Sequence, residues 1–170
     1  MKIKDLKLAV AQKNLRISAE SSVAEGKVCK LGIILEDGSD ESVKQFLKLK
    51  EDLNLKQQEV KIVFCGKKSV KNDTFEWPEI SREDFGWKGR VSEKASAFID
   101  AQFDVLVSFT ASENKMASFL VSVTRARLKV GREKTSEKSI FDLNISAELS
   151  EAGIFTEEIK KYLKILNTTI

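Results

Sequence analysis

The clearest hydrophobic pattern lies at residues 103–131, where an apolar run, a polar turn, a helical stripe and a second apolar run follow one another. Residues 103–109 (FDVLVSF) are apolar on both faces of an extended chain, which is typical of a strand covered by helices on both sides. The next apolar residues recur at the spacing of one helix face: Met116, Phe119, Leu120 and Val123. This order predicts a parallel strand–helix–strand unit with a right-handed crossover.

The polar residues between these runs indicate where the helix begins and ends. Ser112 is expected to cap the helix, because its hydroxyl can accept a hydrogen bond from an unpaired amide of the first turn. Arg125 and Arg127 follow, where cations suit a helix C-terminus. The next strand is expected to start near Leu128 and to close at Gly131.

The rest of the chain repeats this alternation of strands and helices. Further strands are expected at 28–35, 59–65 and 140–145, and further helices after Ser39 or Asp40, at about 92–101 and from Thr156. The pattern predicts an α/β fold: a single three-layer Rossmann-like domain at 27–170, with a mostly parallel five-stranded sheet and helices on both faces. Residues 1–26 are expected to form a short amphipathic helix and a connecting loop.

One segment, residues 67–91, follows neither period. It holds a basic loop and then Phe75, Trp77, Phe85 and Trp87 among glycines and charges. Such an insertion is either functional or packs its own aromatics against the sheet, and packing is favoured because large rings usually anchor irregular segments. If the insertion is functional, Phe85 and Trp87 are the candidates for a surface that binds a protein partner or a second copy of the chain.

Composition narrows the class of protein. The 170 residues are one domain's worth, and no apolar run reaches the ~20 residues that span a bilayer. The N-terminus lacks the form of a secretory signal, so a cytoplasmic protein is expected, and no membrane partner is expected. Residues 1–30 carry seven basic and three acidic side chains, which we interpret as a solvated helix face rather than a nucleic-acid site, because dense basic clusters are absent.

The cysteine and histidine content excludes several chemistries. The chain has no histidine, which removes Ser-His-Asp and Cys-His mechanisms and histidine-ligated metals. Cys29 and Cys65 fall in expected strands and are interpreted as buried, reduced thiols, although a disulfide between adjacent strands is an alternative. Two isolated cysteines do not make a structural zinc site, so neither a metal nor a cofactor is expected.

Candidate ligand-binding residues are the polar ones expected at the carboxyl ends of the strands, where open parallel sheets bind ligands. They are Asp37 and Ser39 after the first strand, and Thr110, Ser112 and Asn114 after the third. Both loops lead into helix N-termini, which can hold a small anion through free amides. Capping and turn formation explain the same residues without a ligand, and no glycine-rich phosphate loop or nucleophile elbow is present.

Three arginines offer a second anion-binding possibility. Arg125, Arg127 and Arg132 would form a phosphate clamp if the fold gathered them. Ordinary surface charges near a helix end are the alternative.

Six stretches distributed along the chain carry a resemblance to known proteins: LGIILEDG (31–38), EISREDFGWKG (79–89), FDVLVSF (103–109), ARLKVGR (126–132), FDLNI (141–145) and KKYLKIL (160–166). Through these stretches, the chain resembles a family of small α/β proteins of Bacteroidota, about this length, to which no function is assigned. Residues 103–132 also resemble a strand–helix–strand stretch of heptosyltransferase-type glycosyltransferases, which have two Rossmann-like halves. That local resemblance implies one half-domain without the donor site, and it implies no catalytic residue.

Three functions follow from these observations. The favoured one is a non-catalytic binding or interaction module that uses the strand-end crevice or the aromatic insertion. The alternative is a small transferase or hydrolase that binds a phosphorylated or nucleotide-type ligand at the strand ends. Nucleic-acid binding by the basic N-terminal arm is a weaker third hypothesis, for which affinity would fall steeply with salt.

Overall fold

Five parallel strands form the centre of the protein. The computed structural model describes residues 28–36, 40–65, 77–132 and 140–168, so the helix expected near the N-terminus lies outside the described residues. The strands are β1 (Leu31–Leu35), β2 (Val60–Phe64), β3 (Phe103–Phe109), β4 (Ala126–Arg132) and β5 (Leu143–Ile145). They pair in the order β2-β1-β3-β4-β5, and every pairing is parallel. This order is one of the two common doubly wound arrangements, and its direction reverses between β1 and β3.

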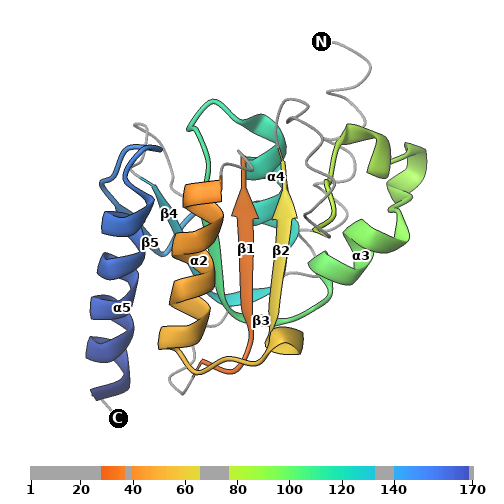
Figure 1. The fold of residues 1–170 in the computed structure, drawn as a ribbon. Coiled ribbons are helices and arrows are strands. Elements are labelled where there is room, and N and C mark those ends of the chain that lie inside the picture. The colour runs from red at the N-terminus through yellow and green to blue at the C-terminus, as the bar shows by residue number, and fades with distance from the viewer. Residues whose placement is uncertain (1–27, 37–39, 66–76, 133–139, 169–170) are drawn as a thin grey trace.

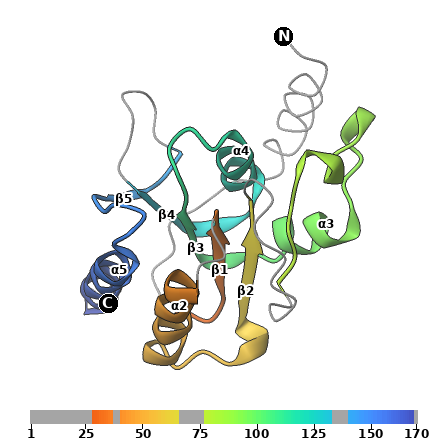
Figure 2. The same cartoon turned by 45° about the horizontal axis from the view of Figure 1, so that its top comes forward.

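Helices cover both faces of the sheet (Figures 1 and 2). They are α2 (Asp40–Asp52), α3 (Glu93–Ile99), α4 (Lys115–Val123) and α5 (Ala152–Thr168). Helices α2 and α5 lie side by side on one face, and α3 and α4 lie on the other. The expected three-layer α/β fold is therefore confirmed. In the part of the chain that the structure describes, no helix has both the length and the apolar character needed to cross a membrane.

The two faces of the sheet bury separate cores. Leu31, Ile33 and Leu35 of β1 point toward α2 and α5, where the rings of Phe46 and Phe155 complete the core. The intervening residues point the other way and meet a second core, which α3 and α4 fill with mainly aromatic and branched side chains: Phe98, Ile99, Phe119, Leu120 and Val123. All five residues of β1 are buried, as a central strand between two helix layers requires.

A carboxylate ties the central strands together at their N-terminal ends. The Oδ2 atom of Asp104 accepts hydrogen bonds from the backbone amides of Cys29 (2.8 Å) and Lys30 (2.9 Å), which lead into β1. The other oxygen of Asp104 lies 3.5 Å from Nη1 of Arg127 on β4. One side chain on β3 thus contacts both neighbouring strands at the edge opposite the expected ligand site.

Several expected boundaries were wrong: β1 begins at Leu31 rather than at residue 28, and β4 begins at Ala126 rather than near Leu128. For α5 and β5, packing explains the difference. Helix α5 begins at Ala152 rather than at Thr156, because Ala152 and Phe155 already belong to the buried face of its first turn. The hydroxyl of Thr156 donates to the carbonyl of Gly153 inside the helix (3.0 Å). Strand β5 begins at Leu143 rather than at residue 140, after the ring of Phe141 has packed on Gly131, where a Cβ atom would sit 2.4 Å from the ring.

Candidate functional site at the carboxyl ends of the strands

The expected ligand site lies where β1 and β3 end side by side, at the reversal of strand order. Asp37 and Ser39, predicted to contribute from the loop after β1, lie outside the described residues. Glu36 directly follows β1, and Thr110, Ser112 and Asn114 follow β3. The residues of the second loop can therefore be compared with the prediction one by one.

Both the oxygen and the nitrogen of the Asn114 side-chain amide form hydrogen bonds. Its Oδ1 atom accepts a hydrogen bond from the backbone amide of Ala117 (3.0 Å), which makes it the N-cap of α4. Its Nδ2 group donates to Oε1 of Glu36 (2.7 Å) and to the backbone carbonyl of Cys65 (2.6 Å). Asn114 thus joins the ends of β1 and β2 to the start of α4, and these bonds occupy its polar atoms.

The two hydroxyl residues of this loop have different surroundings. Thr110 is buried, and its Oγ1 atom lies 3.0 Å from Oγ of the equally buried Ser108. Ser112 is exposed and donates to the carboxylate of its neighbour Glu113 (3.2 Å). The expectation that Ser112 caps α4 was wrong, because the helix begins three residues later and Asn114 takes that role.

The three arginines do not gather into a clamp. Arg127 lies near the start of β4, beside Asp104, whereas Arg132 is the last residue of the same strand. In an extended strand that rises ~3.3 Å per residue, five residues separate their backbones by about 16 Å. Arg125 precedes the strand, so it too lies at the edge away from Arg132.

Arg132 instead ties two loops at the candidate site. Its Nε atom donates to the carbonyl of Ala147 (2.8 Å), and its Nη1 atom donates to the carbonyl of Thr110 (3.0 Å). The remaining Nη2 atom lies 4.0 Å from Glu148, and the side chain is only 18% exposed. The guanidinium therefore fixes the loops after β3 and β5, and little of it faces solvent.

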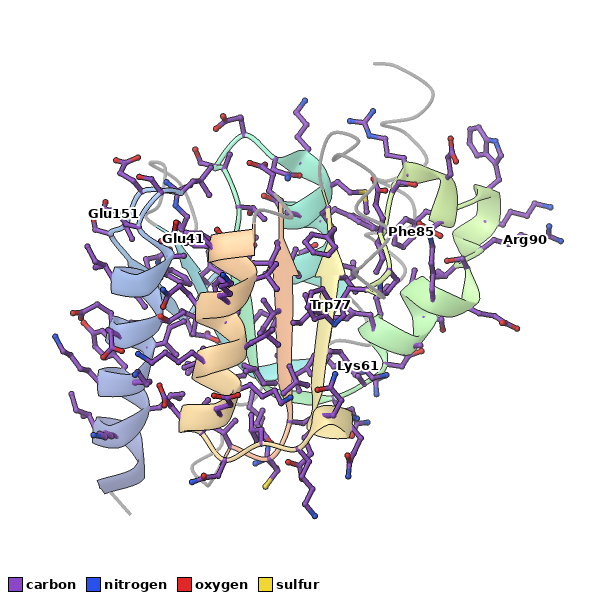
Figure 3. The ribbon with its side chains drawn as sticks, viewed as in Figure 1. Glu41, Lys61, Trp77, Phe85, Arg90 and Glu151 are labelled. Atoms are coloured by element: carbon purple, nitrogen blue, oxygen red, sulfur yellow. The ribbon has the colours of Figure 1, made fainter. Side chains whose placement is uncertain are left out.

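The aromatic insertion separates into anchoring rings and one exposed ring. Phe85 is 2% exposed and meets Phe119 of α4 edge-to-face, with ring centroids 4.8 Å apart. Trp77 is partly buried and packs on Phe64 of β2 (Figure 3). Trp87 differs, because 49% of its surface is exposed. Phe85 is therefore a core residue and offers no partner surface, which corrects its prediction, while Trp87 remains a candidate.

The loop that carries Trp87 has a fixed backbone. Phe85 and Val91 form an antiparallel bridge, and the amide of Gly86 donates to the carbonyl of Arg90 (2.8 Å). Lys88 (φ 62°) adopts the left-handed conformation that residues other than glycine seldom adopt. Neither Lys88 nor Arg90 is buried, and Arg90 lies on the outer side of the insertion while Phe85 lies between the insertion and the sheet (Figure 3).

Asp84 holds the base of this loop, a role that sequence reasoning missed. Its carboxylate accepts hydrogen bonds from the amide of Ser81 (2.8 Å) and the hydroxyl of Ser92 (2.7 Å), and Lys94 lies 3.6 Å away. The spacing of Ser81 and Asp84 is that of a capping box, in which Asp takes the place of the usual Glu or Gln. That pattern was the available signal in the sequence.

The two thiols differ in exposure, which corrects the expectation that both are buried. Cys29 is exposed, whereas Cys65 is buried at the end of β2. Burial, and to a smaller extent the carboxylates of Glu79 and Asp84, raise the pKa of the Cys65 thiol to about 12. In the described residues, no group of three or more acidic or cysteine side chains is placed to hold a metal ion.

Alkylation should distinguish the two thiols. At pH 8, we expect iodoacetamide to modify Cys29 in the folded protein and to modify Cys65 only after unfolding, since the buried thiol stays protonated. The raised pKa also means that the folded chain holds this proton more tightly than the unfolded chain. The protonated Cys65 thiol therefore makes its full contribution to stability below about pH 9, and this contribution is lost as the pH rises toward 12. Intact-mass spectrometry with and without urea checks the first point, and rapid native modification of both thiols would contradict it.

The comparison with known proteins places the chain in a family. A model described as a family of unknown function (DUF6913) matches residues 3–166, so the chain belongs to that family. The expected membership of a family without an assigned function is thereby confirmed. No curated protein and no solved structure matches the chain.

Proposed function

We propose that this member of the DUF6913 family is a non-catalytic binding module, and that the loop carrying Trp87 contacts its protein partner. The observation that supports this proposal most is the combination of a half-exposed indole with a backbone fixed on both sides of it. Tryptophan contributes large binding energies at interfaces, and a preorganised loop loses little conformational entropy when it binds. The fold supplies such a loop by anchoring Phe85 in the core.

The strand-end edge supports the non-catalytic part of the proposal. Asn114 donates to the Glu36 carboxylate and the Cys65 carbonyl and accepts from the first turn of α4. Arg132 donates to two backbone carbonyls. A residue that binds a substrate or transfers a proton needs a donor, a lone pair or a proton that is not already used in another hydrogen bond. These two side chains are therefore better suited to holding loops than to catalysis.

The charges beside Trp87 indicate the chemistry of the partner. Lys88 and Arg90 flank the indole and are exposed. A complementary surface would hold an apolar pocket for the ring, with carboxylates around its rim. We propose an acidic protein surface of this kind as the partner, and from the sequence we propose that the two meet in the cytoplasm of a member of the Bacteroidota.

The test compares Trp87→Ala with a matched control, Leu149→Ala, in which another exposed large apolar side chain is removed. Full-length bait of each form is used to capture partners from the native lysate, and binding of the captured protein is then measured with purified components. An interface hot spot costs at least ~2 kcal/mol, so Trp87→Ala should weaken binding about 30-fold, whereas Leu149→Ala should leave it unchanged. Both variants should melt within about 2 °C of wild type.

Two results would count against the proposal. One is an equal loss of binding in both variants, or no loss in either, which would show that the indole does not contact the partner. The other is a rise of several degrees in melting temperature with a nucleotide, nucleotide sugar or sugar phosphate. That rise would favour the transferase or hydrolase alternative and would direct attention back to the strand ends.

A further inference from the structure

Helix α5 has two large aliphatic side chains on the face turned away from the sheet. Its inner face is buried through Phe155, Ile159 and Leu163. On the opposite face, Ile154 is 51% exposed and Ile165 is 60% exposed. Figures 1 and 2 show α5 at the outer margin of the molecule, beside α2 and beyond the edge strand β5. Single exposed aliphatic residues are common on protein surfaces, but these two belong to an ordered pattern along the helix.

The outward face forms a stripe with an unusual symmetry, here called the α5 stripe: Ile154, Glu158, Lys161 and Ile165. Successive members are four, three and four residues apart, which places them within one narrow sector of a helix with 3.6 residues per turn. Read from either end, the stripe begins with an aliphatic residue, and a charged residue follows. The two central residues, Glu158 and Lys161, carry opposite charges and form an ion pair at 2.9 Å within one chain.

We propose that the α5 stripe is the interface of a two-fold symmetric homodimer. When two copies of α5 run antiparallel about the midpoint of the stripe, Ile154 of one copy faces Ile165 of the other at both ends. In the middle, Glu158 of each copy faces Lys161 of its partner. A two-fold interface must present the same patch from both copies, and this stripe is complementary to itself in both polarity and charge.

The small area of the α5 stripe limits the strength of this dimer. One helix face buries less than the ~800 Å² per partner of a standard interface, so we expect a weak dimer whose population depends on concentration.

This inference goes beyond the proposed function, because an enzyme and a binding module could pair through the same helix. The Trp87 loop lies on the other side of the molecule from α5 (Figure 1), so the dimer leaves that loop accessible. A failure of the Trp87 experiment therefore says nothing against the dimer, and the reverse also holds.

Charge exchange tests the proposal with four proteins: wild type, E158K, K161E and the double variant E158K/K161E. Sedimentation velocity over a concentration series measures the dissociation constant of each. In either single variant, like charges meet at both central contacts, and self-association should weaken at least tenfold. The double variant reverses both charges and restores the complementarity, so it should associate about as well as wild type.

Mixing the two single variants gives the most specific result. In a mixed dimer, both central contacts join a base from the E158K chain to an acid from the K161E chain. The mixture should therefore dimerise at concentrations where each component alone stays mostly monomeric. E83K, a charge reversal at an exposed site in the aromatic insertion, is the matched control and should behave as wild type. Thermal unfolding of each variant shows whether folding is retained.

Three results would overturn the dimer: wild type that stays monomeric at several hundred micromolar, single variants that associate as wild type does, or a mixture that does not associate. The first result overturns the dimer whether or not any variant folds, because it uses wild type alone.

Discussion

Replacing Phe155 with alanine is expected to lower the free energy of unfolding by about 3–5 kcal/mol, because it removes a fully buried ring that joins α5 to the sheet. The ring lies between Phe46 of α2 and Phe109 of β3, with centroid distances of 6.2 Å and 4.9 Å. Its removal leaves a cavity at the meeting point of three elements. Urea unfolding measures the loss, and the melting temperature should fall by roughly 10 °C.

Two control variants make this result interpretable. Phe155→Leu keeps most of the volume and should cost less than about 1.5–2 kcal/mol. Ile154→Ala changes the adjacent residue on the exposed side of the same turn and should alter stability by no more than about 0.5 kcal/mol, measured at low micromolar concentration where the chain is monomeric. A loss below about 1 kcal/mol for Phe155→Ala would show that α5 does not pack on the sheet as described.

Asn114→Asp is expected to cost about 2–3 kcal/mol, although the two side chains have nearly the same shape. The carboxylate can still accept from the amide of Ala117, but it loses the Nδ2 donor and turns an oxygen toward Glu36 and the carbonyl of Cys65. The change therefore leaves a partly buried acceptor unsatisfied and adds repulsion between two carboxylates. Urea unfolding of the variant and wild type at pH 7 measures the cost.

The pH dependence provides a second measurement of the same variant. The Glu36 carboxylate and the Cys65 carbonyl should raise the pKa of the introduced acid, so the folded variant binds a proton more tightly than the unfolded variant. Its stability relative to wild type should therefore recover as pH falls through that raised pKa. Asn114→Ser, which removes the donor without adding charge, should lose less and show no such recovery. Equal costs for both variants at pH 7 would contradict this account of Asn114.

The strands and most helices could be predicted because their signals are local. Residues 103–109 have apolar side chains at both odd and even positions, which is typical of a strand covered on both faces, and β3 occupies that range. The start of α5 was predicted four residues too late, because Thr156 followed by Glu157 and Glu158 has the pattern of a capped first turn. Ala152 and Phe155 already have the spacing of the buried face. The helical periodicity of the buried residues therefore extends back to residue 152.

The candidate site was less predictable, because its contacts join distant parts of the chain. Asn114 was identified as a strand-end residue, but its bonds to Glu36 and Cys65 cross 78 and 49 residues of sequence. The arginine clamp failed for a reason that was available in advance, since Arg127 and Arg132 fall at opposite ends of one strand. By contrast, nothing in the local pattern separated the buried Phe85 from the exposed Trp87, because the insertion has no period.

The parallel sheet also has a consequence for how the chain folds. Strand β1 lies in the middle of the sheet, yet its partner β3 comes far later in the sequence, and the bonds of Asp104 to residues 29 and 30 span 75 and 74 residues. Pairing of β1 with β3 therefore closes a long loop, and the contacts that form must offset the chain entropy lost in that closure. During synthesis, β1, α2 and β2 emerge with one edge of β1 still unpaired, and that edge is protected only once β3 has left the ribosome. Folding should thus be slow relative to helical proteins of the same length, and the interval before β3 arrives is when the nascent chain is most exposed to aggregation.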